Sequence, residues 1–196
     1  MSDAVRVDGR RQRGEDNRAR IVRAMLELIL DGDYTPNAEQ VATRAEVSLR
    51  TVFRHFEDMD RLYREIASPL ETELRQLAQK PFTSDHWQAR ILELVDRRSQ
   101  AFEKLAPYRR AANVHRHRSQ QLAEDGRRFA IVLREILKHN LPEAFHGTDL
   151  IETLDVLMSI ETWLRLREEQ GLSPERAQQV LESAVRRLLE TPAAKA

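Results

Sequence analysis

The stretch TPNAEQVATRAEVSLRTVFRHF, residues 35–56, constrains the fold of this 196-residue chain more than any other, because it predicts two short helices joined by a tight turn. Asn37 can cap the first helix by accepting from the backbone N–H of Gln40, whose side chain reaches back in a capping box. Ser48 is the natural N-cap of the second helix. The apolar residues expected to bury one side of each helix are Val41, Ala42, Ala45, Val52, Phe53 and Phe56. This arrangement predicts a helix-turn-helix.

Positive charge gathers around this stretch although the whole chain is neutral, with 32 basic and 32 acidic side chains. Residues 6–23 hold seven arginines against three acidic residues. The second short helix holds Arg50, Arg54 and His55 with no acidic residue. A concentrated basic surface is typical of nucleic-acid-binding domains, so the pattern predicts DNA binding. Two interpretations of residues 1–16 stay open: a flexible basic arm that enters a minor groove, or a solvated tail.

Together with the amphipathic helix before it and the segment FEDMDRLYREI after it, the stretch resembles the DNA-binding domain of the TetR family of bacterial transcriptional repressors. The positions that match the family's pattern are Val41, Ala42, Val47, Ser48, Phe53, Phe56 and Leu62. The positions that depart from it are Glu46 in place of a common glycine and Phe53 in place of tyrosine. Met59 and Asp60 stand where the family tends to carry a lysine and an acidic residue, so a cation is missing there. If the backbone at Glu46 is left-handed, a non-glycine residue there costs about 1 kcal/mol.

The resemblance implies that the second short helix reads a double-stranded DNA operator. The DNA-contacting residues that it implies are Asn37, Ser48, Leu49, Arg50, Thr51, Phe53, Arg54 and His55. Ser48 and Thr51 then hold phosphate oxygens. Arg50 contacts guanine O6 and N7, and Leu49 contacts a thymine methyl. Phe53 packs against the sugar or a thymine methyl, and Arg54 and His55 flank the DNA backbone.

Helical periodicity with short connections predicts an all-α fold: an N-terminal three-helix helix-turn-helix DNA-binding domain and a C-terminal helical ligand-binding and dimerisation domain. The predicted boundaries are a flexible basic arm over 1–16, the DNA-binding domain over 17–66, the helical body over 67–191 and a tail over 192–196. Pro69 is expected to kink the helix that leaves the DNA-binding domain, and Pro107 to start a new helix near Tyr108.

The last two predicted helices, 148–170 and 174–191, form an antiparallel hairpin, because Gly171, Ser173 and Pro174 supply a C-cap, an N-cap and an N1 residue. Their apolar stripes are Leu150, Leu154, Leu157, Met158, Ile160 and Leu164, and Ala177, Val180, Leu181, Ala184, Val185, Leu188 and Leu189. The resemblance implies a homodimer through these two helices, which places two heads on an inverted-repeat operator. The alternative is that the stripes form only the intramolecular core.

The resemblance also implies a repressor that a small-molecule effector, of unknown identity, releases from DNA through the helix containing Pro69. The aromatic residues that can line an apolar ligand cavity are Trp87, Phe102, Tyr108, Phe129 and Trp163, with a plain core as the alternative. A basic run, residues 109–118, suggests an anionic effector or a metal. However, His115 and His117 point to nearly opposite sides of a helix and cannot chelate one ion, which favours a solvated basic face.

Other classes of protein find little support. The chain has no cysteine, so disulfides and thiolate metal sites are excluded, and no segment approaches the roughly 18 apolar residues of a membrane helix. We expect a cytoplasmic protein without a metal or a cofactor. No catalytic motif is present, so an enzyme is not expected. The alternative function is a helical protein-interaction module with a degenerate helix-turn-helix that does not bind DNA, suggested by Glu46, Met59, Asp60 and the zero net charge.

Overall fold

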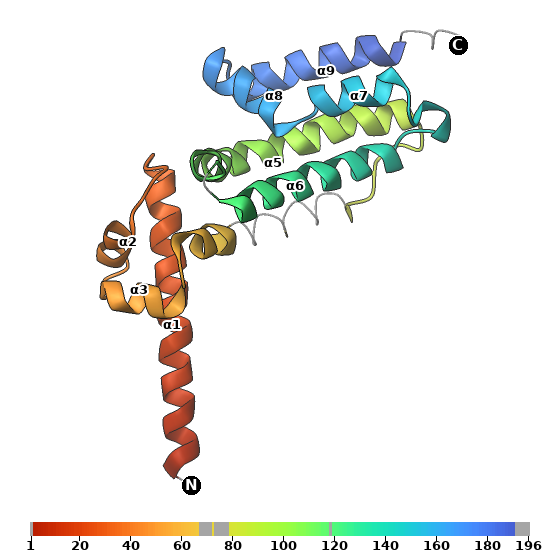
Figure 1. Cartoon of the computed structure of the whole chain (residues 1–196). Helices are drawn as coiled ribbons and strands as arrows, with labels where there is room; N and C mark the ends of the chain where they lie inside the picture. Colours follow the sequence, from red (N-terminus) through yellow and green to blue (C-terminus); the bar gives the residue numbers. More distant parts are fainter. Residues whose placement is uncertain (1, 67–71, 73–78, 118, 191–196) are drawn as a thin grey trace. The chain divides into compact units, whose positions relative to one another are not determined.

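The computed structural model of the chain describes residues 2–66, 72, 79–117 and 119–190, with side chains from residue 14 onward. Across these residues the chain forms helices and turns and no strand, so the predicted all-α fold is confirmed (Figure 1). No helix in this part of the chain is long and apolar enough to cross a membrane.

The chain packs as two compact units. The head unit comprises residues 1–72 and 107–123, and the body unit comprises residues 73–106 and 124–196. The sequence assigns the segment 107–123 to the body, but Ala111 and Leu122 are buried in the hydrophobic core of the head. The predicted domain boundary after residue 66 therefore separates the chain by sequence order, whereas the packed head also includes the later segment 107–123.

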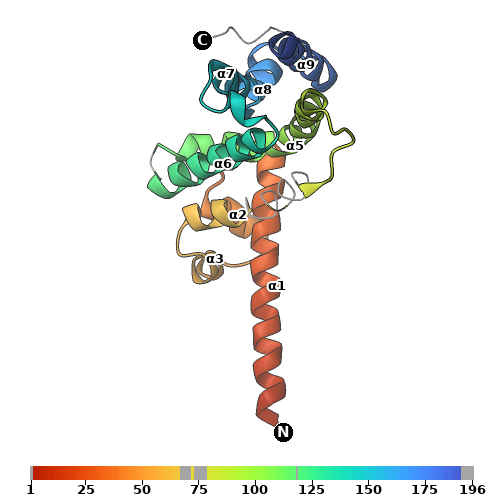
Figure 2. The ribbon, with the colours of Figure 1, turned by 90° about the vertical axis from the view of Figure 1, so that its right-hand side faces the viewer.

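The head contains α1 (Ser2–Leu30), α2 (Ala38–Arg44), α3 (Leu49–His55) and the helical residues 59–66. Helices α2 and α3 contact each other and lie against α1 (Figures 1 and 2). The apolar face predicted for α1 is confirmed, with exposed fractions of 9% or less at Ile21, Ala24, Met25, Leu28 and Ile29. The buried residues that meet it from the other elements of the head include Val41, Ala42, Ala45, Val52, Phe56, Leu62, Tyr63 and Ile66.

The N-terminal part of α1 is helical back to Ser2, so the flexible arm predicted over 1–16 is wrong for residues 2–16. In Figure 1 this red part of α1 extends beyond the turns against which α2 and α3 lie. The segment has no proline and holds four arginines, which favour helices. Gly9 and Gly14 cost the helix about 1 kcal/mol each but do not end it.

Helix α5 runs without interruption from Trp87 to His115 and passes through Pro107. The prediction that Pro107 starts a new helix is therefore wrong. Proline removes one backbone hydrogen bond and costs a helix interior about 3 kcal/mol, which tertiary packing can offset. Here Ala106 is buried in the body core and Ala111 in the head core, so the helix is anchored on both sides of the proline. The kink predicted at Pro69 lies outside the described residues.

The body is built from the first part of α5 together with α6 (Gln120–His139), α7 (Asp149–Leu157), α8 (Ile160–Leu164) and α9 (Pro174–Glu190). The single helix predicted over 148–170 is wrong, because the backbone leaves the helix at Ser159. The Ser159 hydroxyl accepts from the Thr162 N–H at 3.2 Å and so caps a new helix, α8. A π-helical turn, Arg165–Glu169, continues it.

The predicted turn into α9 is confirmed. Gly171 has a φ of +64°, and the Ser173 hydroxyl accepts from the Arg176 N–H at 3.2 Å. The residues of the two apolar stripes that are 9% exposed or less are Leu154, Met158, Ile160, Leu164, Ala177, Leu181 and Val185. For these residues the intramolecular interpretation holds. The apolar surface left for a partner consists of half-buried residues and of Val156, which is 67% exposed.

Candidate nucleic-acid interface

The turn between α2 and α3 is left-handed at Glu46, whose φ is +52°. The Glu46 N–H donates to the Thr43 carbonyl at 3.1 Å, and the Val47 N–H donates to the Ala42 carbonyl at 3.0 Å. This pair of bonds is a Schellman motif, in which glycine usually occupies the left-handed position. Glu46 is the one non-glycine residue with positive φ in the described part of the chain, so the departure from glycine does carry a backbone cost.

A side-chain contact holds the same turn against α1. Arg20 Nη2 lies 3.1 Å from Glu46 Oε2 and donates to the Glu46 carbonyl oxygen at 3.4 Å. Both side chains are exposed, and exposed ion pairs contribute at most about 1 kcal/mol. Arg20, one of the arginines that the charge pattern assigns to the DNA-facing surface, therefore also has an intramolecular partner.

The two caps predicted for the short helices are confirmed. Asn37 Oδ1 accepts from the Gln40 N–H at 2.9 Å, and Gln40 Oε1 accepts from the Asn37 N–H at 2.8 Å. Ser48 Oγ accepts from the Thr51 N–H at 3.2 Å and lies 2.8 Å from Thr51 Oγ1. The Ser48 bonds fix the start of α3.

The outward face of α3 carries Leu49, Arg50, Phe53 and Arg54, all of which are exposed. Phe53 is 48% exposed, so the prediction that it supplies the buried side of the helix is wrong. The buried side is formed by Val52 and Phe56, each 1% exposed and four residues apart. A seven-residue helix buries only this narrow stripe, and Phe53 lies about 100° around the helix from Val52.

The two arginines of this face differ from their neighbours in the head. Arg50 and Arg54 make no side-chain hydrogen bond or ion pair within the described part of the chain, whereas Arg44 pairs with Asp31 at 2.9 Å. The face also contains no acidic residue between Val47 and Phe56. Both guanidinium groups can therefore bind an external acceptor.

His55 differs from the other residues that the sequence predicts to contact DNA. It is half-buried, and its Nε2 is enclosed without a hydrogen-bond partner within the described part of the chain. Burial, followed by the charges of Arg54 and Arg18, lowers the pKa of His55 below its usual value of 6.5. The ring is therefore mainly neutral at pH 7 and does not offer the extra positive charge that the sequence suggests.

Arg18 is a positioning residue that the sequence interpretation missed, because it was counted only as part of the basic surface. Its Nη1 donates to the His55 carbonyl at 3.2 Å, and its Nη2 lies 2.9 Å from Glu65 Oε2. Its position three residues before Ile21, on the apolar side of α1, is a signal that could have indicated an intramolecular partner. A cation at this point is also favourable for the free carbonyl groups in the last turn of α3.

The predicted ligand-binding aromatics do not form one cluster. Phe102 and Trp163 are buried in the body core, and Phe129 packs against Phe102 with ring centres 6.5 Å apart. Trp87 packs on the edge of the same core. Tyr108 packs against the head core instead, so it does not belong with the other four.

The basic run over 109–118 is not simply a solvated face. Arg110 donates to the Tyr34 hydroxyl at 2.8 Å, and His115 Nε2 lies 2.9 Å from the Tyr63 hydroxyl. These contacts join the end of α5 to the rest of the head. No group of three metal-ligating side chains occurs in the part of the chain that the structure describes.

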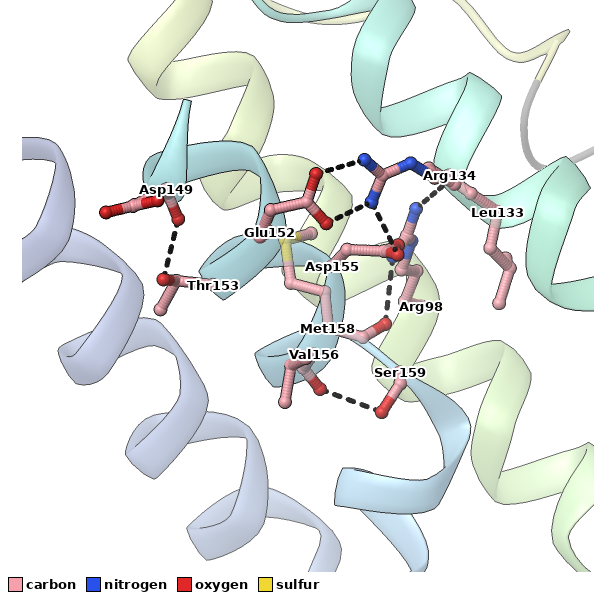
Figure 3. Close-up of polar contacts among 10 residues, drawn as sticks. All are labelled: Arg98, Leu133, Arg134, Asp149, Glu152, Thr153, Asp155, Val156, Met158 and Ser159. Atoms are coloured by element: carbon pink, nitrogen blue, oxygen red, sulfur yellow. Dashed lines mark hydrogen bonds and ion pairs between the residues drawn. The ribbon is translucent and has the colours of Figure 1, made fainter. Parts of the chain in front are cut away.

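Arg98 is a buried cation of the body and is 5% exposed (Figure 3). Its guanidinium donates to the carbonyl oxygens of Leu133 on α6 and Met158 at the end of α7, the latter at 2.9 Å. Burial lowers the pKa of Arg98 to about 10, and the charge of Asp155 opposes that shift. Arg98 therefore stabilises the break between α7 and α8, which periodicity alone does not reveal.

Comparison with known proteins supports the fold. No protein-family profile matches the sequence, and no curated protein is similar to it. The crystal structure of a transcriptional regulator from Rhodococcus sp. Rha1 is similar, with a TM-score of 0.65 and 19% sequence identity. The similarity covers 88% of this chain and 96% of that one, so it includes both the head and the body.

Proposed function

We propose that the chain is a sequence-specific DNA-binding transcriptional regulator of the TetR type, with α3 as the helix that enters the major groove. The observation that carries the proposal is the outward face of α3, where two arginines without intramolecular partners accompany two exposed apolar side chains. Such arginines can pair with guanine or with phosphate. The similarity in fold to a transcriptional regulator supports the same function.

A homodimer and an effector complete the proposal. Helix α3 has seven residues, so one copy contacts few base pairs, and two copies on an inverted repeat multiply the specificity. The half-buried residues Val180, Ala184 and Leu188 on α9, with Val156 on α7, support the terminal hairpin as the dimer face. Release of the repressor by a small molecule is proposed on the family resemblance, with the ligand shifting the balance between two states of the protein. The proposal includes no catalytic step and no cofactor.

Footprinting of the purified protein on DNA that flanks its own coding region tests this function. The expected result is a protected inverted repeat, bound with an affinity that falls steeply as salt rises. Arg50→Ala is expected to weaken binding to that repeat by about 1–3 kcal/mol and to leave binding to scrambled DNA nearly unchanged. Arg127→Ala, which removes an exposed positive charge from the body, is the matched control.

Equal losses on the repeat and on scrambled DNA would remove base reading from Arg50. Failure to bind any duplex would favour the alternative function, a helical protein-interaction module whose helix-turn-helix does not bind DNA. The exposed acidic Glu46, at the turn that leads into α3, is the feature that favours this alternative. Partner binding by such a module need not weaken with salt in the same way.

A further inference from the structure

Ile131 and Val132 form an exposed apolar patch on α6, with 59% and 56% of their surface accessible. Among the side chains that the structure describes, they are the one pair of exposed large apolar residues adjacent in the chain. Both are β-branched, and such residues favour a helix less than glutamine, glutamate or lysine does. Helix propensity therefore does not explain them at solvent-exposed positions, whereas cover by a partner gains free energy from their burial.

The patch lies on the side of α6 opposite to the body core. Leu133 and Leu137 belong to that core and are 7% and 0% exposed. At 100° per residue, the direction midway between Ile131 and Val132 is nearly opposite to that of the two leucines. In Figures 1 and 2, α6 lies on the other side of the body from α9, so the patch is separate from the α9 part of the proposed dimer face.

Two opposite charges flank the patch symmetrically. Arg128 lies three residues before Ile131, and its side chain is 65% exposed. Glu135 lies three residues after Val132 and is also exposed. Residues three and four apart share a helix face, so both charges lie on the same side of α6 as the apolar pair. Arg128 pairs with Asp125 within the helix, a surface contact that contributes little and can be exchanged for another acceptor.

A second copy of α6 that runs antiparallel matches this arrangement. A two-fold axis between residues 131 and 132 places Arg128 of each copy opposite Glu135 of the other, because both lie equally far from the axis. The same axis places Ile131 against its own copy and Val132 against its own copy. A parallel pair would instead bring the two Arg128 side chains together, which is unfavourable.

We propose that α6 is a surface through which two copies of this chain associate antiparallel, with a reciprocal ion pair on each side of an apolar centre. The surface goes beyond the DNA-binding function and does not depend on it. It is small, so the association is weak and rises with concentration. Where copies are already joined through the terminal hairpin, the α6 surface links these dimers to one another.

Sedimentation equilibrium of the full-length protein without DNA tests the proposal at concentrations up to the millimolar range. The mass of the unmodified protein is expected to rise with concentration above that of the double variant Ile131→Gln/Val132→Gln. Glutamine favours a helix more than valine or isoleucine does, and both positions are exposed, so the variant is expected to keep its fold. The comparison holds with or without a dimer through the terminal hairpin, because both proteins carry the same hairpin.

Exchange of the two charges tests the antiparallel arrangement. Arg128→Glu and Glu135→Arg each turn two symmetric attractions into two repulsions, so each is expected to weaken association by roughly tenfold. The double variant Arg128→Glu/Glu135→Arg restores opposite charges and is expected to associate as the unmodified protein does. Arg127→Glu is the matched control, because Arg127 is exposed and the charge change is the same, but it lies about 100° around the helix from Arg128.

Three results would overturn the proposal. A mass equal to that of the glutamine variant at every concentration would show that α6 does not associate. A double charge variant that stays as weak as the single variants would exclude the pairing of Arg128 with Glu135. Equal weakening by Arg127→Glu would reduce the effect to net charge. Because no DNA is present, each of these results is separate from success or failure of the proposed function.

Discussion

The guanidinium carbon of Arg18 lies 4.6 Å from the centre of the Phe56 ring, directly over the aromatic residue that ends α3. The same guanidinium donates to the His55 carbonyl and pairs with Glu65 on the helical residues 59–66. One side chain of α1 therefore holds the end of the candidate recognition helix against two other elements of the head. A cation in this position is favourable because the carbonyl dipoles of α3 point toward it.

Loss of this contact is expected to destabilise the head. Arg18→Ala should lower the free energy of unfolding by about 1–2 kcal/mol, because it removes charged hydrogen bonds whose partners are partly exposed. Arg18→Lys keeps the charge but not the planar fork, and should fall between the alanine variant and the unmodified protein. Urea denaturation gives the values, with Arg23→Ala, an exposed arginine of the same helix, as control. An Arg18→Ala protein as stable as the control would show that the contacts of Arg18 do not stabilise the head.

The left-handed turn makes a second prediction. Glu46→Gly should be more stable than Glu46→Ala by about 1 kcal/mol, because only glycine adopts a φ of this sign without steric cost. Both variants lose the side-chain ion pair with Arg20 and keep the backbone carbonyl that Arg20 contacts, so the comparison isolates the backbone contribution. Thermal unfolding followed by circular dichroism measures the difference, and equal melting temperatures would show that the turn carries no strain.

Stability should depend on pH through His55. Its pKa is lowered in the folded protein by burial and by the charges of Arg54 and Arg18, so the unfolded chain binds a proton more readily. The stabilisation is therefore fully present above about pH 6.5 and is lost as pH falls through the lower folded pKa. The free energy of unfolding of His55→Gln should change less between pH 7.5 and 5 than that of the unmodified protein. His139→Gln, at an exposed position in the body, should keep the original pH dependence.

The buried side chain of Arg98 supports a fourth prediction. Arg98→Ala should lower the free energy of unfolding by roughly 3 kcal/mol or more, because it leaves a cavity and removes two charged hydrogen bonds to buried carbonyl oxygens. Arg98→Met fills most of the volume without a charge to desolvate, so its loss should be smaller. Urea denaturation compares the two variants, and equal losses would show that packing volume has no part in the effect.

Local contacts explain the features that the sequence predicted correctly. The capping box at Asn37, the cap at Ser48 and the tight turn at Glu46 each depend on groups within five residues of one another. The apolar face of α1 also follows from spacing alone, because residues three and four apart share one side of a helix. Helical content, the turn at Gly171 and the basic character of α3 were also predictable from local sequence.

Contacts between distant residues decided the rest. Phe53 and Phe56 are equally apolar, but Phe56 is buried in the core of the head with Arg18 over its ring, whereas Phe53 is exposed. Pro107 stays inside a helix because both sides of it are packed, although its local preference is to break one. The sequence by itself therefore determined the helices, caps and turns of the reading head. Tertiary packing decided which side chains of the head are exposed to solvent. The reason is that burial of whole side chains outweighs helix propensities of about 1 kcal/mol.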